Sequence, residues 1–209
     1  MTVNDNKKVK MIKTYAIINH HKVYYEDFPR YVSGHLQKVI CSKEMESRGK
    51  LLIKNEFPSE DLIDFIEAVC TWGGRYAITG KILDKNNNST KFIRRCFKKA
   101  YSYLSNGYKN VDAALDCLLA IHGLGISFAS KHLRFVSPKL CPILDSNISE
   151  FLNYSLTTSN YAKYSILCTD LAKILKDLKI GNPMKRPKKT WYAADVDMAL
   201  FAKKRGWWR

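Results

Sequence analysis

The spacing of hydrophobic residues predicts a mainly helical chain. From residue 59 onward, apolar side chains recur at intervals of about three and four, which places them on one face of an α-helix. The clearest segment begins at Pro58-Ser59 and ends at Gly73-Gly74, with acidic residues early in it, where the helix dipole favours them. Its apolar positions are Leu62, Ile63, Phe65, Ile66 and Val69.

The same pattern predicts further helices, which are separated by turn-forming residues. The composition LDKNNNST at 83–90 is typical of a loop. The sequence Gly123-Leu124-Gly125 is typical of a tight turn. After the second of these turns, Pro138 follows a helical segment that ends near residue 136. Helices are therefore expected over 89–105, 111–121, 126–136, at SNISEFL (146–152), over 161–178 and over 191–204.

Residues 1–58 lack a clear helical period. They mix tyrosine and lysine with short apolar runs, such as TYAII at 14–18 and LLI at 51–53. Short strands or extended segments are expected there. The predicted class is mainly α, with small β elements near the N-terminus.

Charge narrows the class of partner. The chain has 209 residues, of which 46% are hydrophobic, and 35 Lys+Arg oppose 19 Asp+Glu, so the net charge is +16. That apolar content supports a folded core, and the positive charge indicates a polyanion, nucleic acid before an acidic membrane. Residues 111–183 stand out because their net charge is only +1.

Several other classes are disfavoured. No apolar run approaches the roughly 20 residues of a membrane-spanning helix, and the first residues lack the apolar core of an export signal. We therefore expect a cytoplasmic protein without membrane contact. The six cysteines are spread along the chain without a CxxC pair, so a structural zinc or an iron–sulfur cluster is not expected.

The near-neutral stretch carries the strongest signal for function. Residues 118–148 read LLAIHGLGISFASKHLRFVSPKLCPILDSNI, in which a helix enters Gly123-Leu124-Gly125 and a second helix leaves it. Two glycines let a backbone turn tightly and approach another molecule closely. The free N–H groups at the start of the second helix favour an anion, and a duplex phosphate suits a basic chain.

Here the sequence resembles the helix-hairpin-helix DNA glycosylases. Their hairpin has the form LPGVG-x-x-x-A and is followed by an aspartate in a context such as I-L-D-x-N-V. In this chain Gly123-Leu124-Gly125, Ala129 and PILDSNI (142–148) occupy those places, and Asp145 lies 18 residues after Ser127. Residues 65–86 and 190–201 also resemble a prokaryotic group with the 8-oxoguanine-glycosylase fold, whose members are linked to base excision from modified phage DNA.

The resemblance implies one glycosylase-like domain of two helical lobes over residues 1–209, with the helix-hairpin-helix at about 111–136. It implies a monomer that acts on double-stranded DNA without a cofactor, although a monovalent cation at the hairpin stays open. Bifunctional members carry a nucleophilic lysine where Ser127 stands, so the implied enzyme is monofunctional and uses water. Lys131, one helical turn further on, is the alternative nucleophile of a glycosylase with lyase activity.

Asp145 also has a rationale of its own. Cleavage of an N-glycosidic bond builds positive charge on the sugar, and a fixed carboxylate stabilises that charge. The competing interpretation makes Asp145 only the N-cap of the helix at SNISEFL. A chain that binds DNA through its hairpin without any catalysis is a further alternative.

The expected DNA contacts cluster at the hairpin. They are His122, Gly123, Leu124, Gly125, Ser127 and Lys131. A second set, Arg94 and Lys98, lies on the polar face of the helix over 89–105, where it forms either a phosphate-facing strip or a solvated surface. Trp72 is one of several aromatic candidates for the wall of a base pocket, and Glu26 and Glu67 are candidates for an acid that protonates the departing base.

Overall fold

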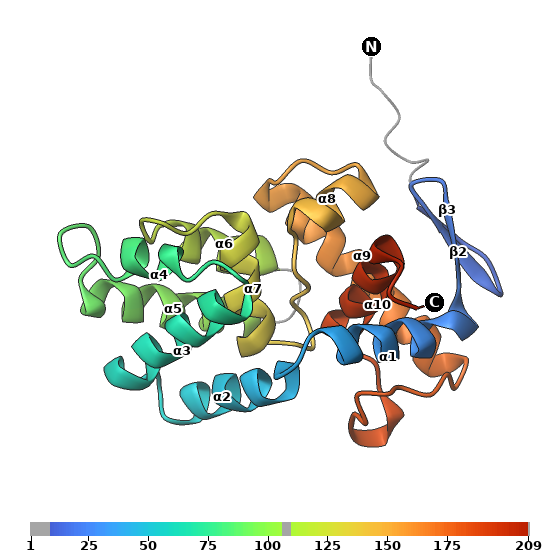
Figure 1. Cartoon of the computed structure of the whole chain (residues 1–209), viewed down its shortest axis with the longest axis horizontal. Coiled ribbons are helices and arrows are strands. Elements are labelled where there is room, and N and C mark those ends of the chain that lie inside the picture. The colour runs from blue at the N-terminus through green and yellow to red at the C-terminus, as the bar shows by residue number, and fades with distance from the viewer. Residues whose placement is uncertain (1–8, 106–109, 209) are drawn as a thin grey trace, which may run out of the picture.

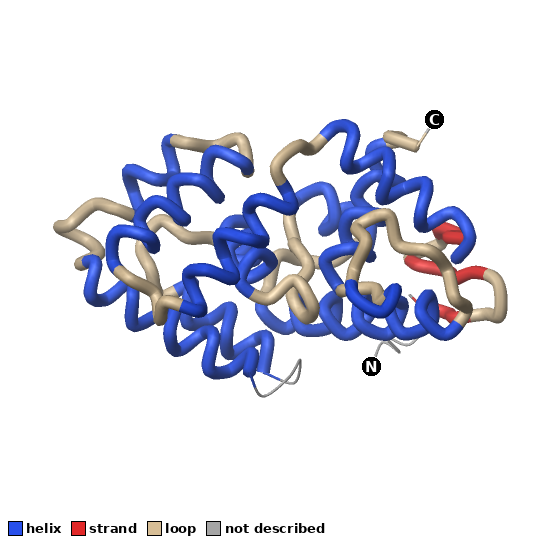
Figure 2. The backbone as a smooth tube through the Cα atoms, turned by 90° about the horizontal axis from the view of Figure 1, so that it is seen from below, coloured by secondary structure: helices blue, strands red, loops and turns tan. Residues whose placement is uncertain are grey.

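The computed structural model describes residues 9–105 and 110–208 and is mainly α-helical (Figure 1). At its N-terminal end, β1 (Val9–Met11), β2 (Tyr15–Ile18) and β3 (His21–Tyr24) form an antiparallel sheet in that order, and Tyr15 pairs with Tyr24. The strands lie at one end of the molecule (Figure 2). The α-helices are α1 (Phe28–Lys38), α2 (Ser42–Lys54), α3 (Ser59–Trp72), α4 (Ala77–Ile82), α5 (Thr90–Ser105), α6 (Val111–Leu119), α7 (Ile126–Val136), α8 (Ser146–Leu152), α9 (Thr158–Asp177) and α10 (Ala193–Arg205).

The helices that hydrophobic spacing predicts are confirmed, with boundaries within three residues of expectation. The clearest agreement is α3, which begins directly after Pro58 and ends at the glycine pair. The small β elements near the N-terminus are confirmed as well.

The hydrophobic spacing did not predict α1, α2 or α4, and α1 and α2 occupy much of the segment expected to be extended. The helices α1 and α2 each contain a glycine in close contact with backbone from elsewhere: a Cβ on Gly34 would collide with the backbone of Trp207, which follows α10, and one on Gly49 with the backbone of Phe135 in α7. A helix packed so closely against other backbone buries a small residue there instead of a large apolar one. The apolar stripe is therefore interrupted where each helix is packed most tightly.

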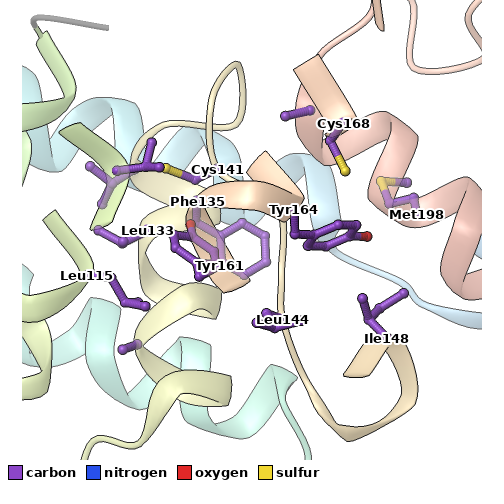
Figure 3. Packing of buried hydrophobic residues seen from close by; sticks show 14 of the residues in the cluster. Leu115, Leu133, Phe135, Cys141, Leu144, Ile148, Tyr161, Tyr164, Cys168 and Met198 are labelled. Carbon is purple, nitrogen blue, oxygen red and sulfur yellow. The ribbon is translucent and has the colours of Figure 1, made fainter. Parts of the chain in front are cut away.

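The helices form two groups, with α7 between them (Figure 1). In one group α5 packs on α6, and in the other α10 packs on α1 and α9. Contacts of α6 with α9 and of α2 with α7 join the groups. Figure 3 shows how Leu133 and Phe135 of α7, Leu144 of the following segment and Tyr161 and Tyr164 of α9 meet in one hydrophobic core.

A buried ion network ties α2, α7 and α10 together. Glu46 of α2 accepts a hydrogen bond from Arg134 Nη1 at 2.9 Å and two from Arg186, at 2.5 and 2.9 Å. Arg186 also pairs with Asp195 at the start of α10. Because all four side chains are nearly inaccessible to water, this network fixes how the three helices meet.

No helix in the described residues is long and apolar enough to cross a membrane.

Candidate functional site

The turn between α6 and α7 is built around Gly123. Its φ is +92°, and a Cβ there would meet Lys81 Cβ at 2.9 Å and the Ile82 backbone at 3.2 Å. Both the conformation and the space therefore require glycine. Leu124 is 7% exposed and anchors the turn in the core, whereas His122 and Gly125 are exposed.

Asn88 holds the entrance of this turn. Its Nδ2 donates to the carbonyl oxygens of Ile82 and His122, both at 2.9 Å, and its Oδ1 accepts from the His122 N–H at 3.0 Å. The Asn88 side chain is buried, although it belongs to the loop NNN. Sequence analysis missed this role, because one asparagine among three in a turn carries no signal of burial.

The start of α7 is open to an anion. Gly125 is the N-cap, with φ −95° and ψ 171°, and no side chain caps this end of the helix. A Cβ on Gly125 would meet no atom within 4 Å, so the surrounding space is free. The first N–H groups of a helix have no acceptor within it, and at α7 they lie beside the exposed Gly125, an arrangement that favours an anion.

Lys131 and Asp145 meet behind this turn. Lys131 Nζ donates to Ser127 Oγ at 3.1 Å and lies 3.8 Å from Asp145 Oδ2, so the lysine reaches back one helical turn. Asp145 Oδ1 accepts from the Ile148 N–H at 3.1 Å, which confirms it as the N-cap of α8. One carboxylate thus serves both contacts, and capping leaves Oδ2 available to the lysine.

Ser130 sets the position of Asp145 relative to α7. Its side chain is fully buried, and its Oγ accepts from the Leu144 N–H at 3.2 Å, one residue before the carboxylate. The segment that carries Asp145 is thereby attached to the same helix as Lys131. Sequence analysis did not single out Ser130, because serine within an amphipathic helix has no distinguishing pattern.

The Lys131 amine lies in a poorly hydrated environment. Its side chain is 9% exposed, Nζ lies 4.9 Å from the centre of the Phe128 ring, and Gly73 leaves room for its stem. Burial lowers the pKa of Lys131, and the charges of Asp145 and Asp197 only partly offset that effect. A larger fraction of this amine is therefore neutral, and so nucleophilic, than in an exposed lysine.

A cavity of about 240 Å³ opens onto this pair. Trp72 contributes an aromatic wall, and its buried Nε1 has no hydrogen-bond partner among the described residues. The cavity is lined by His35, Val39, Trp72, Gly73, Lys131, Ile143, Asp145, Asn147, Asp197, Phe201 and Trp207. It lies between the two groups of helices, because these residues come from or directly follow α1, α3, α7 and α10, or belong to α8 and the segment before it.

Two titratable residues of the cavity were not predicted. Burial, followed by the charge of Arg134, lowers the pKa of His35 to about 3, so its imidazole is neutral at physiological pH. Asp197 is 3% exposed, and burial raises the pKa of its carboxyl to about 7. Its sequence context, ADVDMALF, indicates a buried helix and does not single out an acid.

Arg94 and Lys98, which the sequence offers as DNA contacts, lie away from this cavity. Arg94 Nε donates to the Phe57 carbonyl at 2.7 Å, and Lys98 Nζ lies 3.6 Å from the Glu56 carboxylate. Both therefore connect α5 to the chain that follows α2, and neither lines the cavity. Of the two candidate acids, Glu26 is exposed in the short turn after β3, and Glu67 lines a separate groove beside Trp72.

Comparison with protein-family models, with curated proteins and with solved structures finds no match to this chain. The geometry alone therefore defines what the site can do. It places a carboxylate and a poorly hydrated amine in one partly enclosed cavity, and the exposed N-terminus of α7 lies on the same helix as that amine.

Proposed function

We propose that this protein is a helix-hairpin-helix DNA glycosylase that hydrolyses the N-glycosidic bond of a modified or damaged base. The observation that carries the proposal is the meeting of Asp145 and Lys131 in a cavity one helical turn from the open start of α7. Phosphate binding alone does not need a carboxylate beside this cavity. Cleavage of the N-glycosidic bond does need one, because positive charge develops at C1′ of the deoxyribose.

DNA would be bound through the turn at 122–125. The N–H groups at the start of α7 would donate to an oxygen of a backbone phosphate, and Ser127 lies in the first turn of the same helix. A nucleotide rotated out of the duplex then reaches the cavity between the two helix groups, where Trp72 offers a surface for its base.

The chemistry would take place at Asp145. The C1′–N bond breaks with its electron pair leaving on the base, which takes up a proton. The Asp145 carboxylate stabilises the resulting sugar cation, and water adds to C1′ and loses a proton. Hydrogen bonding from Ile148 holds this carboxylate in place before the reaction begins, which is the condition for efficient electrostatic stabilisation.

The test compares parental and Asp145→Asn protein on a panel of DNA duplexes. The panel contains 8-oxoguanine, hypoxanthine, uracil or 5-hydroxymethylcytosine, together with heavily modified phage DNA. Alkaline cleavage of the product reveals abasic sites, and fluorescence anisotropy measures DNA binding. We expect parental protein to form abasic sites and Asp145→Asn to bind equally well but release no base. Binding without base release by the parental protein would instead support a noncatalytic DNA-binding module.

A second candidate, glycosylase with lyase activity, is favoured by one contact. Lys131 Nζ lies 3.1 Å from Ser127 Oγ, beside the position that carries the nucleophilic lysine in bifunctional relatives. In this reaction the neutral amine bonds to C1′ as the base departs, and loss of a proton with opening of the sugar ring gives an iminium. Borohydride would trap that species as a covalent DNA adduct, absent in Lys131→Met. If base release proceeds without any adduct, the enzyme is monofunctional.

A further inference from the structure

Asp197 carries a buried carboxyl that has no role in the hydrolysis proposed above. It lies in α10, two residues after Asp195, and both side chains are almost inaccessible to water. Asp195 has a structural role, since it accepts hydrogen bonds from the Tyr192 N–H, Asn182 and Arg186. Asp197 shares none of these partners. Among the described residues it forms no ion pair.

Among the side chains that the structure describes, one from α9 forms a hydrogen bond with Asp197. Tyr164 donates its hydroxyl proton to Oδ1 at 2.7 Å, and Figure 3 shows the Tyr164 hydroxyl directed toward the helix that carries Met198, the neighbour of Asp197. Tyr164 is itself fully buried. A buried carboxyl that has only neutral donors and no paired cation is favoured in its protonated form.

The two acids of the cavity therefore differ in environment. Asp145 has an amine within 4 Å and an N–H donor at a helix start, contacts that stabilise a negative charge. Asp197 lies in the same cavity, but among the described residues no cation lies within 4 Å of its carboxyl. Paired carboxyls in contrasting environments characteristically divide a hydrolysis between them, one charged and one acting as the proton donor.

We propose that Asp197 is the general acid of this site and donates its proton to the departing base while Asp145 stabilises the sugar cation. The assignment rests on the proposed glycosylase function. When the C1′–N bond breaks, the electron pair goes to the base nitrogen, which takes the proton from Asp197. Water then bonds to C1′ and gives a proton to the Asp197 carboxylate, so the acid is restored and no outside proton is consumed.

The groups around Asp197 predict how the reaction depends on pH. Burial raises its pKa most, the Tyr164 hydrogen bond lowers it, the charge of Asp145 raises it, and Arg134 and the Ile143 backbone lower it, with a net value of about 7. Lys131 faces it from α7, Cys168 from α9 and neutral His35 across the cavity. Base release should therefore fall as the pH rises through about 7.

Asp197→Asn and Tyr164→Phe test the assignment on the duplex of the panel that parental protein cleaves fastest. Asparagine keeps an acceptor for Tyr164 but cannot donate the proton, so single-turnover base release should fall by about 100-fold or more and lose its decline above neutral pH. Tyr164→Phe removes a hydrogen bond that stabilises the charged carboxylate. The decline should then move to higher pH, which a purely structural tyrosine would not cause.

The outcomes separate this assignment from the proposed function. If parental protein releases a base and Asp145→Asn does not, while Asp197→Asn keeps the parental rate and pH profile, Asp197 is not the acid and the glycosylase function stands. If parental protein releases no base from any duplex, both proposals fall. Circular dichroism checks folding, and if Asp197→Asn does not fold, an unchanged pH profile in Tyr164→Phe overturns the assignment.

Discussion

Nζ of Lys131 lies 3.8 Å from Oδ2 of Asp145, and the two residues reach this contact from opposite directions. Lys131 extends back along α7 toward Ser127, whereas Asp145 stands at the start of α8, on a segment attached to α7 through Ser130. The contact therefore depends on how α7 and α8 are joined. A site of this kind is sensitive to small shifts of either helix.

The two roles of Asp145 can be separated by two substitutions. Asparagine is as good an N-cap as aspartate, so Asp145→Asn should keep the stability of α8 while base release is lost. Asp145→Ala removes the cap as well and should cost about 1 kcal/mol of unfolding free energy. Urea unfolding of the three proteins measures this difference. Equal stability of the two variants would show that the cap contributes nothing.

Lys131→Met should be more stable than the parental protein at neutral pH. Because burial lowers the pKa of Lys131, its charged form is less favourable in the folded chain than in the unfolded one, and methionine removes this cost. The gain in stability should be largest at neutral pH, where the amine is charged in the unfolded chain. It should shrink as the pH rises through the lowered folded-state pKa and disappear above the ordinary value of 10.5, where the amine is neutral in both states. Unfolding by urea at pH 7 and pH 10 tests this, and destabilisation at pH 7 would contradict it.

The glycines of the hairpin should respond differently to alanine. Gly123→Ala should destabilise the protein by about 1 kcal/mol or more, because its φ is +92° and a Cβ would press on Lys81 and Ile82. Gly125→Ala is the matched control, since its backbone is extended and its surroundings are open. It should fold normally but weaken DNA binding, as the methyl group covers the start of α7. Thermal melts and anisotropy titrations distinguish these effects, and normal stability in Gly123→Ala would contradict the first.

Glu46 should make the fold sensitive to acid. Burial raises its pKa, but hydrogen bonds from Arg186 and the charges of Arg134 and Arg186 outweigh that effect, so the pKa lies below the ordinary 4.5. The stability that Glu46 contributes is therefore present above pH 4.5 and lost as the pH falls through the lower folded-state value.

Glu46→Gln should accordingly lose about 3 kcal/mol at pH 7, because two buried arginines lose a charged partner. The difference from the parental protein should narrow below pH 4.5. Glu44→Gln is the control, since its pair with Arg48 on the same helix is exposed and contributes little. A constant difference across the whole pH range would show that Glu46 acts through packing alone.

Helix positions were largely predictable, and two of the helices that were not predicted share a cause. The helix α3 follows from its own apolar spacing, acidic start and terminal glycines. The missed helices α1 and α2 bury Gly34 and Gly49 against backbone from other parts of the chain. The neighbouring sequence does not indicate that a backbone carbonyl from a distant segment packs against these glycines. From the sequence alone they therefore resemble loop residues.

The candidate site likewise combines features that follow from the local sequence with contacts between distant segments. The turn at 122–125, the cap at Asp145 and a lysine one turn beyond Ser127 are all local features, and the sequence by itself determined them. Asn88 and Ser130 belong to the site only because buried carbonyl and N–H groups from other segments need partners there. Asp197 joins the site because α10 packs beside α9, which brings Tyr164 to its carboxyl. Chain geometry sets turns and caps over a few residues, but the environment of a buried acid is made by segments far apart in sequence. Only the tertiary structure decided which acids share the cavity, and in which environment each one lies.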